Sequence, residues 1–220
     1  MEKSLESYNT IYKGGIGEII MKKSRFIAYV SPVETEDEAI AFIDGIRKKH
    51  WDATHNCYAY IIGNRNPIMR FSDDGEPSQT AGKPMLDVLT AKELCNLVVV
   101  VTRYFGGTLL GTGGLVKAYQ SATIEGLNNS TIIKKEPGII VKIVTDYNLI
   151  GKIQYFIGQE NIPLISSDYT DTVTLSLVIP NDKFDSFNNK LADLSNGSLI
   201  PTKIKEVYFA SIDGKVNLFE

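Results

Sequence analysis

The spacing of hydrophobic positions changes along the chain, and this change predicts an α+β fold. Apolar residues recur at helical spacing after Thr35, which forms a capping box with Glu38. Residues 98–101 are four consecutive valines, which is typical of a strand buried on both faces. Further strands are predicted at residues 12–21, 26–33, from 55, and at 68–71, and further helices at residues 85–94 and 115–128.

Beyond residue 138 the elements follow a simple order. The periods predict a strand, a helix, two strands, a helix and a strand, at residues 139–145, 149–157, 162–168, 172–179, 182–194 and 199–209. This βαββαβ order predicts a ferredoxin-like domain, with two helices on one face of an antiparallel sheet. The polar segment 132–137 predicts the boundary. We therefore expect two domains, residues 1–136 and residues 137–220.

A glycine-rich segment follows the buried strand and precedes a helix. It contains two aromatic residues and five glycines: Tyr104, Phe105, Gly106, Gly107, Gly111, Gly113 and Gly114. Backbone N–H groups at a helix N-terminus favour an anion, and glycine lets a ligand approach the backbone. The alternative is that the glycines serve only turns and packing. The segment matches neither a GxxxxGK[ST] phosphate loop nor a GxGxxG dinucleotide motif.

Three basic residues are candidates for the same anion site. Lys83 lies at a helix start, where positive charge is unfavourable, and this position indicates a nearby anion. Arg25 belongs to a basic cluster that is otherwise an ordinary solvated turn, and Arg103 directly precedes the aromatic pair. We expect these cations to bind phosphate, with Tyr104 and Phe105 stacking on bases.

One histidine and an acidic loop are candidates for catalysis. His55 with Asp73 or Glu76 as its partner can act as a general acid or base on a small anionic or phosphorylated substrate. The alternatives are a structural strand histidine and a solvated loop. These residues and Asp74 also carry donors for a divalent cation, but their spacing fits neither an EF-hand nor a zinc motif. We expect no metal and no cofactor.

Composition limits the functional classes. The 220 residues carry a formal charge of −3, which argues against a broad nonspecific nucleic-acid binder. Cys57 and Cys95 lack CxxC spacing and are expected to be buried and unpaired. The N-terminus does not resemble a signal peptide, and no apolar run has membrane-spanning length. We expect a cytoplasmic protein that does not associate with membranes.

Two motifs resemble bacterial members of the IMPACT family, of the YigZ type. They are RFSDDGEP at residues 70–77 and VVVTRYFGGTLLG at residues 99–111. The segments KKSRF at residues 22–26 and DATHNCY at residues 52–58 also fit. The resemblance implies an N-terminal α/β sandwich similar to domain IV of elongation factor G, followed by the ferredoxin-like domain.

The resemblance also implies an association with translation. We expect a regulatory or binding protein whose residues 1–136 contact RNA, the ribosome or a translation-related protein. The enzyme that uses His55 is the alternative, and a module that binds partners through the C-terminal sheet is a third possibility. The family supplies no catalytic residues, so His55, Asp73 and Glu76 are candidates from the residues alone.

Overall fold

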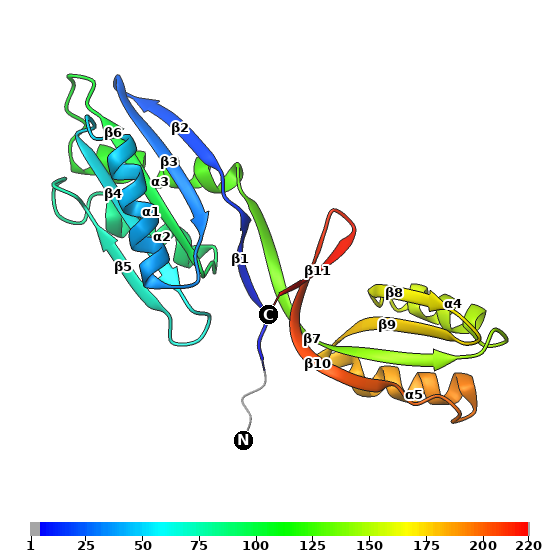
Figure 1. Ribbon diagram of the computed structural model, residues 1–220. Coiled ribbons are helices and arrows are strands. Elements are labelled where there is room, and N and C mark those ends of the chain that lie inside the picture. Colours follow the sequence, from blue (N-terminus) through cyan, green and yellow to red (C-terminus); the bar gives the residue numbers. More distant parts are fainter. Residues whose placement is uncertain (1–4, 220) are drawn as a thin grey trace. The chain divides into compact units, whose positions relative to one another are not determined.

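A computed structural model describes residues 5–219, which form two compact units (Figure 1). The N-terminal unit comprises Tyr8–Lys134, and the C-terminal unit comprises residues 135–219 together with residues 5–7. Helices and sheets occur in both units, which confirms the predicted α+β fold. No helix within the described residues is both long enough and apolar enough to cross a bilayer.

The N-terminal unit is built on a five-stranded antiparallel sheet with helices on both faces. Its elements are β1 (Tyr8–Lys13), β2 (Ile16–Met21), β3 (Ser24–Pro32), α1 (Glu36–Lys49), β4 (His55–Ile62), β5 (Ile68–Ser72), α2 (Gly82–Ala91), β6 (Leu97–Tyr104) and α3 (Thr112–Asn128). The strand order is β2-β3-β6-β4-β5. Helix α1 covers one face, and α2 and α3 cover the other (Figure 1). We call these the α1 face and the α3 face.

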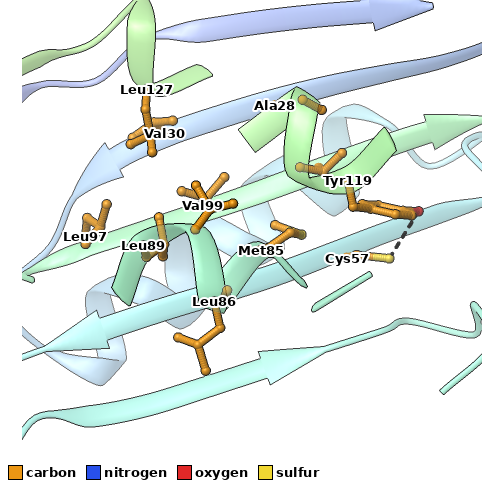
Figure 2. Close-up of a cluster of buried hydrophobic side chains, with 14 of the residues drawn as sticks. Ala28, Val30, Cys57, Met85, Leu86, Leu89, Leu97, Val99, Tyr119 and Leu127 are labelled. Atoms are coloured by element: carbon orange, nitrogen blue, oxygen red, sulfur yellow. Dashed lines mark hydrogen bonds between the residues drawn. The ribbon is translucent and has the colours of Figure 1, made fainter. Parts of the chain in front are cut away.

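The central strand β6 organises both cores. Residues 98–101 have no exposed surface, which confirms burial on both faces. Val99 packs on the α3 face beside Met85, Leu89 and Tyr119 (Figure 2), whereas Val98 packs on the α1 face. Successive side chains of a strand point to opposite sides, so the run of valines supplies both cores.

The C-terminal unit has the predicted ferredoxin-like arrangement. Its elements are β7 (Thr131–Thr145), α4 (Ile150–Gln159), β8 (Leu164–Tyr169), β9 (Val173–Pro180), α5 (Phe184–Ser195), β10 (Thr202–Ile212) and β11 (Lys215–Phe219). The strands pair in the antiparallel order β10-β7-β9-β8, and α4 and α5 pack on one face. Strand β11 was not predicted; it pairs with β10 and extends the sheet.

The segment 132–137, predicted to mark the domain boundary, contains the division between the two compact units at residues 134 and 135, and it lies inside strand β7. One local prediction was wrong. The predicted strand 12–21 is divided into β1 and β2 at Gly14 and Gly15. A Cβ on Gly14 would lie 2.1 Å from the Val30 carbonyl oxygen, so this break lets the chain pass close to β3.

Candidate functional site

The glycine-rich segment connects β6 to α3. Gly107 and Gly111 have φ of +80° and +72°, where glycine is favoured over other residues. A Cβ on Gly106 would lie 2.1 Å from the backbone carbonyl carbon of Lys23, so the segment packs closely on the β2–β3 turn. Helix α3 begins at Thr112, so Gly113 and Gly114 lie in its first turn and not in the loop that was predicted.

A row of side chains crosses three strands on the α3 face. His55 on β4 pairs with Arg103 on β6, which pairs with Phe26 on β3. The guanidinium carbon of Arg103 lies 5.4 Å from the ring centre of Phe26 and 5.5 Å from that of Phe105. The Arg103 guanidinium therefore contacts two aromatic rings, and only 5% of the residue's surface is exposed.

Glu76 supplies the counter-charge of Arg103. Its Oε1 accepts hydrogen bonds from Arg103 Nη1 at 2.6 Å and from Tyr119 Oη at 2.8 Å. Burial of either charge alone would be costly, whereas the hydrogen-bonded pair is tolerated. Burial raises the pKa of the Tyr119 hydroxyl above its ordinary value, so this group remains a proton donor to Glu76 at neutral pH.

His55 has one engaged ring nitrogen and one available. Nδ1 lies 2.7 Å from the backbone oxygen of Asp74, which only accepts, so Nδ1 donates to it. Nε2 lies 3.9 Å from Oε2 of Glu76. This separation exceeds hydrogen-bond length, so the two atoms form no hydrogen bond with each other.

Arg103 keeps one donor without a partner. Its Nη2 makes only a long contact of 3.5 Å to Ser24 Oγ. Its Nε is buried and has no acceptor among the residues that the structure describes. A buried polar atom of this kind is uncommon in folded proteins and calls for an explanation.

These residues line one pocket of about 480 Å³ in the N-terminal unit. Its wall contains Thr54, His55, Gly75, Glu76, Pro77, Arg103, Phe105, Leu109, Leu110, Gly111, Thr112 and Leu115. Polar groups come from the strand row and from the start of α3, and apolar groups come from the loop before α3. The pocket can therefore hold a ligand that has one polar end and one apolar end.

The other two acids of the loop have structural partners. The Asp73 carboxylate accepts from the backbone N–H groups of Gln79, Ala81 and Gly82, and so caps the start of α2. The Asp74 carboxylate accepts from the backbone N–H of Asn56 and pairs with Arg47. Within residues 5–219, no three acid, histidine or cysteine side chains are grouped to hold a metal.

The predicted anion-binding residues do not form a single site. Arg25 and Tyr104 pair across β3 and β6, one position away from the Arg103 row, and Tyr104 packs against the α1 face. Arg25 donates twice to Glu18, at 2.7 and 2.8 Å, and thereby lowers the pKa of that carboxyl. Lys83 pairs with Asp87 one helical turn away, which accounts for its position without an anion.

Both cysteines are buried and neither forms a disulfide, as predicted. Cys57 Sγ lies 3.3 Å from the Tyr119 hydroxyl oxygen, on the core side of the network (Figure 2). Burial raises the pKa of the Cys57 thiol, so it stays protonated and is not a nucleophile.

Several important residues were not predicted for the site. Tyr119 binds Glu76, and Leu109, Leu110 and Thr112 line the pocket. A signal for Tyr119 exists in the sequence, because it follows Leu115 by four residues on the apolar side of α3. The loop leucines carry no comparable periodic signal.

Comparison with known proteins assigns both units. Residues 22–127 match the Impact N-terminal domain, and residues 143–198 match a domain of unknown function (DUF1949). The IMPACT family member YvyE of Bacillus subtilis is 40% identical over 213 residues, which cover 97% of each chain. This chain belongs to the IMPACT family.

Two further relatives agree with the IMPACT assignment. The IMPACT family member YigZ of Escherichia coli is 40% identical over 188 residues, covering 84% of this chain and 92% of YigZ. A crystal structure described as that of a hypothetical protein is 38% identical, with a TM-score of 0.59, and it matches 92% of this chain and 99% of its own. The relatives confirm the family predicted from RFSDDGEP and RYFGGTLLG.

Proposed function

We propose that this IMPACT family member is a translation-associated regulatory protein. In this proposal, its N-terminal unit binds a protein component of the translation apparatus through the pocket and the loop of residues 105–111. The resemblance that implied an association with translation supports the first part. The geometry of the pocket rim supports the second.

The observation that carries the proposal is the exposed apolar rim of the pocket. Leu109 is 81% exposed and Phe105 is 48% exposed, and both line a pocket that also contains buried polar groups. Exposing a large leucine and a phenylalanine beside a concave site is unfavourable in water unless a partner covers them. The buried core of a protein interface is more apolar than its rim, and aromatic residues are enriched in it.

A protein partner fits the charges better than an RNA backbone does. Arg25, Lys83 and Arg103 each pair with a carboxylate, so their charge is already offset. Binding of nucleic acid depends on cations that neutralise phosphates and release counterions. A formal charge of −3 on the whole chain opposes such binding further.

The test is direct binding to purified ribosomes and to purified translation factors, each measured separately. Leu109→Ser should weaken binding at least about tenfold, because the partner loses apolar contact. Ile200→Ser is the matched control, since Ile200 is 83% exposed in the C-terminal unit. Binding should persist between about 50 and 200 mM salt.

Two results would contradict the proposal. If Leu109→Ser binds as tightly as the natural protein, the pocket rim is not part of the interface. Binding that disappears steeply with added salt and resists Leu109→Ser would instead assign the contact to RNA.

One observation favours an enzyme as the second candidate. His55 Nε2 and Glu76 Oε2 lie 3.9 Å apart in a pocket whose wall also contains Arg103. His55 Nε2 can take a proton from a substrate group, and Arg103 can orient an anionic end. Turnover of a small carboxylated or phosphorylated compound that is lost in His55→Gln, with unchanged stability, would favour this candidate.

A further inference from the structure

We propose that the pocket binds the C-terminal carboxylate of a partner chain that ends in an apolar residue. This inference deepens the proposed function and rests on it. Four features of the pocket carry it: the N-terminus of α3, the unpartnered nitrogen of Arg103, the local charge balance and the apolar rim.

The first turn of α3 offers backbone donors to the pocket. Gly111 is the N-cap residue, and it has no side chain that can accept from the first-turn N–H groups. The first turn contains no acidic residue, and Gly111 and Thr112 line the pocket. The positive end of this 17-residue helix therefore faces the pocket without an anionic cap from its own first turn.

The second feature is independent of the helix. The Arg103 side chain is 6% exposed and lines the pocket, and its Nε has no acceptor among the described residues. A buried donor without an acceptor costs free energy. An oxyanion held between this nitrogen and the start of α3 would satisfy both.

The balance of charges around the pocket favours a ligand that carries one negative charge. Glu76 already offsets the charge of Arg103, and its Oε2 remains near the pocket beside His55. A dianionic phosphate would face the Glu76 carboxylate with little positive charge to compensate. A carboxylate needs only a few hydrogen-bond donors, and those are present.

The lining of the pocket favours the C-terminus of a peptide over a small carboxylic acid as the ligand. Pro77, Leu110 and Leu115 provide apolar contacts inside the pocket, which suit one apolar side chain beside the carboxylate. Phe105 and Leu109 continue this surface outward and are exposed at the rim. A ligand that extends out of the pocket covers them, as a peptide does and a small acid does not.

Calorimetric titration of the full chain tests the ligand class with four probes. They are the peptide acetyl-Gly-Gly-Leu as the free acid, the same peptide as the C-terminal amide, 4-methylpentanoate, and inorganic phosphate. We expect the peptide acid to bind at least about tenfold more tightly than each of the others. Equal binding of the amide, or tighter binding of phosphate or 4-methylpentanoate, would overturn the proposal.

A matched pair of variants tests the role of the α3 N-terminus. Thr112→Pro removes the N–H of the first helical residue, a position where proline is tolerated, and Thr112→Ala keeps that N–H. Thr112→Pro should lower the affinity for the peptide acid about tenfold, and Thr112→Ala should not. Equal affinity of both variants would contradict the proposed donor.

An exposed residue provides a second test that does not depend on tolerance of proline. In Leu109→Ser, the gain in affinity from 4-methylpentanoate to the peptide acid should shrink at least about threefold, because Leu109 contacts the part of the peptide that extends out of the pocket. An unchanged gain would place the extended part of the peptide elsewhere. This substitution lies at an exposed position and should leave the fold intact.

The outcomes separate this inference from the proposed function. Loss of ribosome or factor binding in Leu109→Ser, without binding of the peptide acid, would contradict the carboxylate alone. Selective binding of the peptide acid, without binding of any translation component, would contradict the translation role and leave the pocket assignment in place.

Discussion

The two histidines of the chain occupy contrasting polar networks in the N-terminal unit. His50 follows α1 and has both ring nitrogens engaged, with Nε2 2.7 Å from Tyr29 Oη and Nδ1 2.8 Å from Tyr104 Oη. His55 on β4 has only Nδ1 engaged, and its Nε2 lies beside Glu76 in the pocket. The first network is closed and the second is open.

This difference separates a structural site from a candidate binding site. Tyrosine hydroxyls both donate and accept, so they satisfy His50 in its neutral form. Burial also lowers the pKa of His50, which favours that form. Around His55, Nε2 makes no hydrogen bond and Arg103 Nε is buried without an acceptor among the described residues, and both side chains line the pocket. Polar groups left incomplete next to a pocket indicate a place for a ligand.

The largest expected effect comes from breaking the charge pair of the open network. Glu76→Ala should lower the free energy of unfolding by about 3–5 kcal/mol, because Arg103 is left buried without its counter-charge. Urea unfolding followed by circular dichroism measures this loss. The double variant Glu76→Leu with Arg103→Met should recover most of it. A loss below about 1 kcal/mol in Glu76→Ala would mean that water reaches the pair.

The closed network should matter for stability and not for binding. His50→Ala removes the partner of the Tyr29 hydroxyl, so it should lower the free energy of unfolding by about 1–3 kcal/mol. Adding Tyr29→Phe should recover part of the lost free energy of unfolding. Affinity for the peptide acid should stay unchanged in both variants. Loss of that affinity in a folded His50→Ala protein would contradict the claim that the His50 network is structural and the His55 network binds the ligand.

The pH dependence of stability should reflect His50 with a definite sign. Because the folded pKa of His50 lies below its ordinary value of 6.5, the unfolded chain takes up the proton first as pH falls. The stability that neutral His50 contributes is complete above that value and is lost as pH falls through the folded pKa. The stability difference between the natural protein and His50→Gln should therefore shrink at acidic pH. A difference that grows on acidification would contradict this sign.

The smallest effect is expected at a cation that lies outside the pocket. Lys83→Ala removes an exposed pair with Asp87 and should change the free energy of unfolding by less than about 1 kcal/mol. Arg25→Ala breaks the surface pair with Glu18. Neither variant should alter the affinity for the peptide acid in calorimetry. A tenfold loss of affinity for the peptide acid in either variant would contradict this account and support the single anion site that the sequence predicted.

Long apolar patterns made much of the fold predictable. The four valines of β6 predicted a strand buried on both faces, which the structure confirms. Beyond residue 138, the order of strand-like and helix-like spacings of apolar residues predicted the ferredoxin-like arrangement. The start of β7 was missed because a lysine, Lys135, occupies a buried strand position. The expected alternation of apolar and polar residues is therefore absent from the sequence at this point. Strand β11 is short and largely accessible, and it depends on pairing with β10 rather than on its own pattern.

The candidate site was predictable only in part. Strand alternation places Arg103 and Tyr104 on opposite faces, so the two could have been separated from the sequence alone. No periodic rule distinguishes Asp73 from Glu76, which lie in one loop. Their roles depend on tertiary contacts, because Asp73 meets the start of α2 and Glu76 meets Arg103 and Tyr119.

The most direct test of the open network uses the two histidine Cε1 proton signals in NMR. The signals are assigned with His50→Gln and His55→Gln, and acetyl-Gly-Gly-Leu is then added as the free acid. We predict that the His55 signal moves in a saturable way while the His50 signal stays in place. Movement of the His50 signal alone, or no movement of His55 at saturation, would contradict the assignment of the pocket as the binding site.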